Sequence, residues 1–213
     1  MLMGIIYLIR HGRTQWNKEK IFRGQADIPL DTCGKHQAQA LGTTLSRIIS
    51  KRPLFITSPL ERAKETAEIV SSFFQSGNIN IDEHFLDISY GNWEGCSREE
   101  IEKNYPELFQ TWANNPERVT FPGKGENLIT VAHRAERGIY QIAEKNPEGT
   151  TLIFAHQAVN KALLCRLLGA GEQAFWKIGQ DNACWNLLSH NASFFVVTQL
   201  NETCHLGSMS EAE

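Results

Sequence analysis

Short apolar runs alternate with amphipathic segments along this chain, and this alternation constrains the fold more than any other feature. The apolar runs are typical of buried strands and occupy residues 5–9, 54–57, 79–82 and 150–155. Three of them are followed by segments with apolar residues three and four positions apart, as over residues 38–48, which is typical of helices packed on a core. Repeated strand-then-helix units predict an α/β fold, a three-layer sandwich with a mostly parallel central sheet and helices on both faces.

Local signals predict where several elements begin. Thr32 can cap the first long helix, and Ser58-Pro59 is a start signal for the helix after the second strand. Further along, residues 186–189 and 194–198 are expected to form two closing strands, joined as a hairpin by a turn at residues 190–193.

Four polar residues lie at or just after predicted strand ends. Arg10 and His11 end the first strand, and Arg62 stands in the first turn after the second. His156 directly follows the run 150–155. Ligands of such sheets bind outside the carboxyl ends of the strands, so these segments are expected to converge on one rim. Two arginines and two histidines suit a phosphoryl group, because guanidinium forks match phosphate oxygens and histidine can act as a neutral nucleophile near pH 7.

Two segments outside the strand-then-helix units are expected to border this rim. Residues 21–30 read as a loop that can fold over the His11 pocket. Residues 91–125 form an excursion that is expected to wall or cover the site. Two acids, Asp87 and Glu94, lie near its start, and each is either a solvated loop carboxylate or a general acid on the local pattern alone.

Composition narrows the classes of function. A chain of 213 residues suits one compact domain, expected over residues 1–200 and followed by a loose polar tail at 201–213. A formal charge of −3 without long runs of either sign argues against nucleic-acid and membrane partners and leaves room for a small anionic metabolite. No secretory signal or membrane span is predicted, so we expect a cytoplasmic protein. The five widely spaced cysteines, without a C-x-x-C pair, argue against a disulfide framework and structural zinc.

The motifs around these residues resemble the histidine phosphatase superfamily, also called the phosphoglycerate-mutase-like proteins. The matching segments are, in order, LIRHGRTQWN, RGQADIPLDTCGKHQAQALG, TSPLERAKETA, YGNWEG with YPELFQTW, and IFAHQAVNKALL. The resemblance implies that His11 is the nucleophile that becomes phosphorylated. Arg10 and Arg62 would clamp the phosphate, and His156 would be a second donor to the transferring group. The phosphate- and substrate-binding set that it implies is Arg10, Asn17, Gly24, Gln25, Arg62, His156 and Gln157.

Two positions depart from the family pattern. The family usually carries a glutamate four residues before the first glycine of G-x-W-E-G, and in this chain that glycine is Gly91 and the matching residue is Asp87. Asp87 is therefore ranked first as the proton donor and Glu94 is the fallback acid. Where many members have His-Gly-Gly, this chain has His156-Gln157-Ala158, which is similar to the fructose-2,6-bisphosphatase branch.

The resemblance implies a metal-independent phosphomonoesterase without a cofactor, acting on a small phosphorylated metabolite through a phosphohistidine and most similar to α-ribazole phosphatases. The alternatives are a cofactor-dependent phosphoglycerate mutase, a fructose-2,6-bisphosphatase-like enzyme and a catalytically dead phosphate-binding scaffold. The chain has LDISYG where the mutases usually carry N-E-R-x-Y-G, which favours a phosphatase. The intact pairs of arginines and histidines argue against a dead scaffold. An exposed sheet edge would allow a homodimer.

Overall fold

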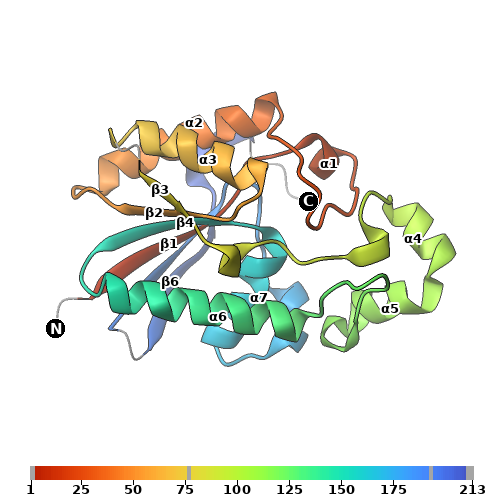
Figure 1. Cartoon of the computed structure of the whole chain (residues 1–213). Helices are drawn as coiled ribbons and strands as arrows, with labels where there is room; N and C mark the ends of the chain where they lie inside the picture. Colours follow the sequence, from red (N-terminus) through yellow and green to blue (C-terminus); the bar gives the residue numbers. More distant parts are fainter. Residues whose placement is uncertain (1–2, 76–77, 192–193, 210–213) are drawn as a thin grey trace.

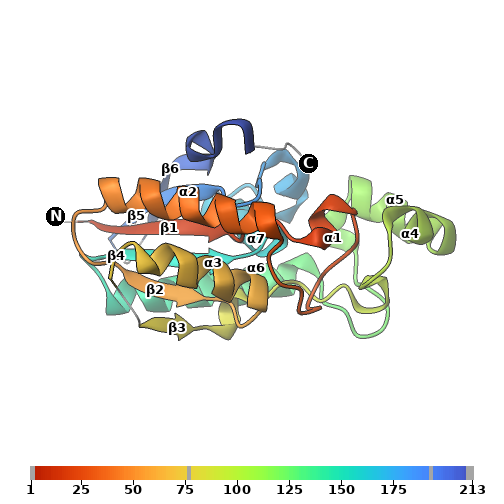
Figure 2. The same ribbon diagram turned by 90° about the horizontal axis from the view of Figure 1, so that it is seen from above.

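A six-stranded sheet forms the centre of the protein. The computed structural model (Figure 1) describes residues 3–75, 78–191 and 194–209. Its strands, in chain order, are β1 (Gly4–Arg10), β2 (Leu54–Thr57), β3 (Ile79–Ile81), β4 (Thr150–Ala155), β5 (Trp185–His190) and β6 (Phe195–Glu202). They lie side by side in the order β3-β2-β4-β1-β5-β6, as Figure 2 shows. The first four pair in parallel, whereas β5 is antiparallel to β1 and β6 is antiparallel to β5.

Two pairs of helices cover the two faces of the sheet. These helices are α2 (Thr32–Ile48), α3 (Glu61–Ser72), α6 (Leu128–Lys145) and α7 (Gln157–Leu167). Figures 1 and 2 show α2 and α3 on one face and α6 and α7 on the other. The predicted α/β sandwich with a mostly parallel sheet is therefore confirmed.

Strand residues alternate between two hydrophobic clusters, one on each face of the sheet. Ile6 and Leu8 of β1 pack in the cluster that contains Ile139 of α6. Ile9 packs in the opposite cluster with Leu45 of α2. Side chains of a strand point alternately to the two faces, so an almost continuous apolar run is what a strand covered on both sides requires.

Two of the predicted helix starts are wrong. Asp31, and not Thr32, caps α2, because its carboxylate accepts a hydrogen bond from the Gly34 amide at 2.7 Å. Helix α3 begins at Glu61 with no side-chain cap, so Ser58-Pro59 precedes the helix. The Ser58 hydroxyl is instead engaged by the side chain of His156.

The excursion over residues 91–125 lies beyond one end of the sheet (Figure 1). Its elements are η2 (Gly91–Trp93), α4 (Arg98–Asn104), α5 (Pro106–Asn114) and η3 (Pro116–Arg118). Trp93 is fully buried and packs edge-on against Phe22 and Phe121, with ring centroids 5.2 and 5.0 Å apart. Buried aromatic rings contribute large apolar area. Phe121 belongs to the excursion itself, whereas Phe22 lies in the loop at residues 21–30, so the ring contact of Trp93 with Phe22 packs the excursion against that loop.

The segment after residue 200 differs from the loose polar tail expected from composition. Strand β6 continues to Glu202, and a short helical segment, η5 (Cys204–Met209), follows it. Leu206 is only 2% exposed, and the Gln37 side chain of α2 donates to the Met209 carbonyl at 3.3 Å. One buried apolar side chain and one backbone contact thus hold a segment whose composition is polar. Residues 210–213, and the part of the predicted hairpin turn at 192–193, lie outside the described residues.

Three shorter elements complete the chain. They are α1 (Gln15–Lys18), η1 (Glu83–Phe85) and η4 (Glu172–Lys177). Among all helices in the described parts of the chain, none is long and apolar enough to cross a membrane.

Candidate active site

The structure brings the four predicted rim residues together at the ends of three neighbouring strands. Arg10 is the last residue of β1 and His11 follows it, whereas His156 follows β4 and precedes α7. Arg62 is the second residue of α3, which follows β2. Each of these side chains is at most 1% exposed. The rings of His11 and His156 lie 5.3 Å apart between centroids.

The ring of His11 is held in one tautomer by the neighbouring peptide. Its Nδ1 lies 2.6 Å from the Gly12 carbonyl oxygen, which can only accept, so Nδ1 carries the proton and Nε2 keeps a lone pair. Burial lowers the pKa of His11 well below 6.5, and the charges of Arg62 and Arg10 add to this effect. His11 is therefore a neutral imidazole at physiological pH.

Arg62 joins the rim to the loop at residues 21–30. Its Nη2 donates to the Gly24 carbonyl at 2.7 Å and its Nη1 donates to the Ala26 carbonyl at 2.8 Å. The same Nη2 forms an ion pair with Asp87 Oδ2 at 2.9 Å. One buried guanidinium thus positions both the loop and a carboxylate beside the two histidines.

The structure places Asp87 inside this cluster. Its Oδ1 accepts from the Ile88 amide at 2.9 Å, and its backbone carbonyl accepts from Gln25 Nε2 and Arg134 Nη2, both at 3.1 Å. Oδ2, which faces Arg62, also lies 3.7 Å from Nδ1 of His156. Although aspartate is one methylene shorter than glutamate, these contacts bring its carboxylate to the rim.

His156 has one engaged ring nitrogen and one that faces the cluster. Nε2 lies 2.7 Å from the Ser58 hydroxyl. Nδ1 is buried and has no hydrogen-bond partner among the described residues. Burial, and the nearby charge of Arg62, lower the pKa of His156 well below 6.5. A neutral ring with an unused polar atom beside Asp87 can donate to a bound oxyanion.

Glu94, the fallback acid, occupies a different environment. Its Oε1 accepts hydrogen bonds from the amides of Gln25 and Tyr90, at 3.2 and 3.0 Å, and from the Ser89 hydroxyl at 3.3 Å. Gly24 has a positive φ of 50°, and an added Cβ there would lie 2.3 Å from Glu94 Oε1. The Glu94 carboxylate therefore braces the loop that Arg62 also holds.

Of the remaining predicted binding residues, all but Gln25 line a cavity of about 600 Å³ beside the rim, and Gln25 contacts the Asp87 carbonyl instead. Asn17, Gly24, Asp87 and Gln157 all line it. The Asn17 carboxamide oxygen accepts from the Thr14 amide at 3.0 Å. It therefore closes the capping box of α1 as well as facing the cavity.

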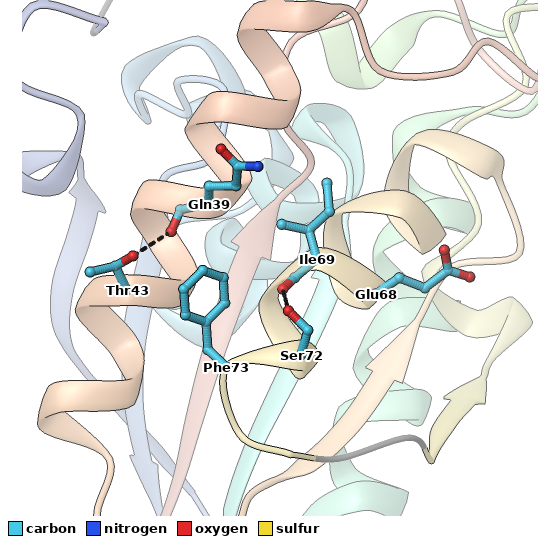
Figure 3. A pocket seen from close by; sticks show the side chains of 6 residues that line it. All are labelled: Gln39, Thr43, Glu68, Ile69, Ser72 and Phe73. Atoms are coloured by element: carbon cyan, nitrogen blue, oxygen red, sulfur yellow. Dashed lines mark hydrogen bonds between the residues drawn. The ribbon is translucent and has the colours of Figure 1, made fainter.

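A second hollow of about 550 Å³ lies between α2 and α3, away from the rim. Figure 3 shows its lining, which consists of Gln39, Thr43, Glu68, Ile69, Ser72 and Phe73. The only ionisable side chain in this lining is Glu68. The nucleophilic and cationic side chains are gathered at the strand ends instead.

Three further residues belong to the site but were not predicted from the sequence. Arg23 lines the cavity and lowers the pKa of both His11 and His156. Ser58 was interpreted as a helix cap, and its partner lies 98 residues away. Asn182 donates to the His11 carbonyl at 3.3 Å from the segment before β5. Only Arg23 had a sequence signal, because it stands in the loop expected to fold over the pocket.

Within the described residues, no three His, Cys, Asp or Glu side chains are grouped so that they could hold a metal ion. The positive charges near the two histidines come from arginines, among them Arg62 and Arg23. Guanidinium groups can stabilise a phosphoryl group by charge and by paired hydrogen bonds.

Known proteins share both the sequence and the fold. The chain is 31% identical to phosphoserine phosphatase 1 of Hydrogenobacter thermophilus over 95% of this chain and 94% of that protein. It is 32% identical to the adenosylcobalamin/α-ribazole phosphatase of Escherichia coli over 92% and 95%. The crystal structure of the α-ribazole phosphatase from Shigella flexneri superimposes with a TM-score of 0.82 at 31% identity, covering 93% of this chain and 96% of that one.

A second solved structure, YhfR of Bacillus stearothermophilus, superimposes with a TM-score of 0.87 at 29% identity, covering 95% of this chain and 99% of the other. The family model of the histidine phosphatase superfamily, branch 1, matches residues 6–203. The alternatives of a mutase, a sugar bisphosphatase and a dead scaffold are not favoured by the phosphatase relatives. The chain therefore belongs to branch 1 of the histidine phosphatase superfamily and is a phosphatase of this type.

Proposed function

We propose that this phosphatase hydrolyses small phosphomonoesters in two phosphoryl transfers, with His11 as the nucleophile and without a metal ion. The observation that carries the proposal is the hydrogen bond between His11 Nδ1 and the Gly12 carbonyl at 2.6 Å. It leaves the Nε2 lone pair available in a ring that burial and arginines keep neutral. A histidine that had to lose a proton first would be a weaker nucleophile near neutral pH.

In the first transfer, Nε2 of His11 forms a bond to phosphorus and the ester P–O bond breaks. Arg10, Arg62 and His156 stabilise the phosphoryl oxygens, and Asn17, Gly24, Gln25 and Gln157 border the bound group. Arg62 turns its donors from Asp87 to the phosphoryl oxygens, which leaves the Asp87 carboxyl group facing the leaving oxygen. Asp87 then gives its proton to the departing alkoxide.

In the second transfer, the Asp87 carboxylate takes a proton from a water molecule, and the resulting hydroxide equivalent attacks the phosphohistidine. The N–P bond breaks, inorganic phosphate leaves and His11 returns to its neutral form. Glu94 takes no part in proton transfer here, because its Oε1 is occupied by three hydrogen bonds to the loop and its surroundings.

The proposed enzyme is a single domain in which residues 91–125 act as a cap over the leaving group. Residues of α4 and α5, including Arg98 and Trp112, line the cavity beside Asp87. Because 600 Å³ is large enough for a metabolite-sized group, the alcohol is expected to contact the cap. α-Ribazole phosphate and phosphoserine, for which the relatives are named, belong in the substrate panel.

The cellular setting that we propose is the cytoplasm, and the proposed partner is the substrate alone or a second copy of the chain. The five cysteines, all within the described residues, form no disulfide, which is typical of a reducing compartment. Strand β6 is an edge of the sheet and could pair two copies. Gel filtration with light scattering distinguishes a monomer from such a dimer.

The test of the nucleophile is His11→Ala, with His133→Ala as a matched control at an exposed position on α6. We expect His11→Ala to lower kcat on a metabolite panel by at least about 10³-fold and His133→Ala to change it less than about twofold. Rapid quenching of the unaltered enzyme with a radiolabelled phosphomonoester should trap acid-labile phosphate on the protein. Near-normal turnover by His11→Ala would refute the assignment.

A further inference from the structure

The cavity beside Asp87 collects positive charge, although the protein as a whole has a formal charge of −3. Four cationic side chains line it, namely Lys20, Arg23, Arg98 and Lys161. The single acidic residue in the same lining is Asp87, whose Oδ2 is paired with Arg62 at 2.9 Å. A cleft lined by one sign of charge focuses the field and raises the local concentration of oppositely charged ligands.

Lys161 occupies the part of the cavity that lies furthest along α7 from the rim. It stands four residues after Gln157, so both face the same side of the helix, separated by about 6 Å along its axis. The Lys161 side chain is buried, and its residue is only 6% exposed. Its ammonium lies 4.9 Å from the ring centroid of Trp176 and 5.3 Å from that of Phe175.

These contacts fix the direction of the ammonium group. Aromatic faces attract cations, and two rings on η4 hold the flexible lysine stem in one place. Trp176 is itself held, because its Nε1 donates to the Trp112 carbonyl of α5 at 2.8 Å. The rings and the cap therefore form one wall in which the charge of Lys161 is already positioned before a ligand arrives.

The rest of the wall is suited to a flat apolar body. Five aromatic side chains line the same cavity as Lys161, namely Phe22, Tyr90, Phe109, Trp112 and Trp176. Aromatic walls with a small number of placed polar groups are typical of sites for metabolite-sized ligands. A substrate that fills this cavity contacts aromatic rings and the ammonium of Lys161 in addition to Asn17, Gly24 and Gln157 of the proposed phosphate-binding set.

We propose that Lys161 binds a second anionic group of the substrate. The preferred phosphomonoesters then carry a flat apolar portion and a carboxylate or a tetrahedral oxyanion, placed about one helical turn from the ester oxygen. This inference rests on the proposed hydrolysis at His11 and specifies the alcohol that leaves. Lys161 is a specificity-determining residue for that alcohol, and it takes no part in the transfer of the phosphoryl group.

The test compares aryl phosphates that differ only at the para position. The three probes are 4-carboxyphenyl phosphate, 4-sulfophenyl phosphate and the uncharged 4-carbamoylphenyl phosphate. We expect kcat/KM for the better of the two charged probes to exceed that for the carbamoyl probe by at least about tenfold, mainly through KM, as one charge-assisted contact allows. The carboxylate and sulfonate arms show whether a planar or a tetrahedral anion fits better.

Two variants test whether Lys161, and not the general positive charge of the cavity, provides the preference for the charged probes. Lys161→Met keeps an unbranched apolar stem and should reduce the preference to less than about threefold, with a melting temperature measured alongside. Lys177→Met removes an exposed lysine from η4 that does not line the cavity, and it should retain the preference.

The outcomes are distinct. If the unaltered enzyme turns over all three probes with equal kcat/KM, the inference is overturned while the proposed function stands. If the preference survives in Lys161→Met, another cation provides it and the role of Lys161 is refuted. If the unaltered enzyme hydrolyses none of the probes and no member of the metabolite panel, the proposed function fails and the inference fails with it.

Discussion

The variant Asp87→Asn distinguishes the proposed roles of the two acids near the rim, Asp87 and Glu94, in proton transfer. Asparagine keeps the shape of aspartate, and its amide oxygen can still accept from Arg62 Nη2, which lies 2.9 Å from Oδ2 in the structure. It can neither give a proton to an alkoxide nor take one from water. The variant therefore removes the proposed proton transfers while preserving most of the contacts that hold the carboxylate in place.

The expected loss follows from the usual contribution of a positioned general acid. For an alkyl phosphate, whose leaving group needs a proton, kcat should fall by about 10²- to 10⁴-fold, which corresponds to roughly 2.7–5.5 kcal/mol in the activation free energy. For 4-nitrophenyl phosphate the first transfer needs no proton, so the hydrolysis of the phosphohistidine becomes the slow step. Stopped-flow measurement should then show a burst of nitrophenolate close to the enzyme concentration.

Glu94→Gln is the matched control. Its amide oxygen can still accept from the Gln25 and Tyr90 amides, so the loop should stay in place and kcat should fall less than about tenfold. Because Asp87→Asn also removes the counter-charge of buried Arg62, its melting temperature is measured first and the assays are run well below it. Normal turnover of alkyl phosphates by Asp87→Asn, together with a large loss in Glu94→Gln, would refute the reasoning and assign the proton transfers to Glu94.

Two further predictions concern pH and the backbone at the nucleophile. The pKa values of His11 and His156 are lowered in the folded protein, so as the pH falls the unfolded chain takes up protons on these rings before the folded protein does. The free energy of unfolding should therefore decrease as the pH falls below 6.5, by about 1.4 kcal/mol per pH unit for each histidine. Urea denaturation at pH 7.0 and 5.5 measures this, and His156→Asn should reduce the slope; a midpoint independent of pH would contradict it. At Gly12, an added Cβ would lie 2.5 Å from the Gly34 carbonyl oxygen, so Gly12→Ala should displace His11 and lower kcat by at least about tenfold. Unchanged steady-state kinetics in Gly12→Ala would show that the turn can move without displacing His11, and would contradict this prediction.

Residues next to a strand end were predictable, because the carboxyl ends of neighbouring parallel strands meet at one rim. This rule alone placed His11, Arg62 and His156 together. The position of the Asp87 carboxylate was suggested by the family motif. The contact with Arg62 that fixes it depends on how the loop folds, which no periodicity describes.

The missed features share a different cause. Ser58 has a residue type and a position that suit a helix cap, and only the pairing of β2 with β4 shows that its hydroxyl meets His156 instead. Asn182 reaches His11 because β5 lies next to β1, although 171 positions separate the two residues in the chain. The polar composition after residue 200 predicted a loose tail, but the single side chain of Leu206 is buried and holds the segment against the protein. Such contacts depend on tertiary neighbours rather than on local spacing.

The bond from His11 to the carbonyl of its own neighbour has an evolutionary consequence. The group that selects the tautomer is a peptide oxygen, so no single side-chain exchange elsewhere can delete it. The cavity wall proposed to bind the alcohol is different, because it is assembled from side chains on α4, α5, α7 and η4. Under the proposed roles, substitutions in this wall should change the preferred alcohol while the tautomer of His11 is kept, so substrates can diversify without loss of the proposed nucleophile.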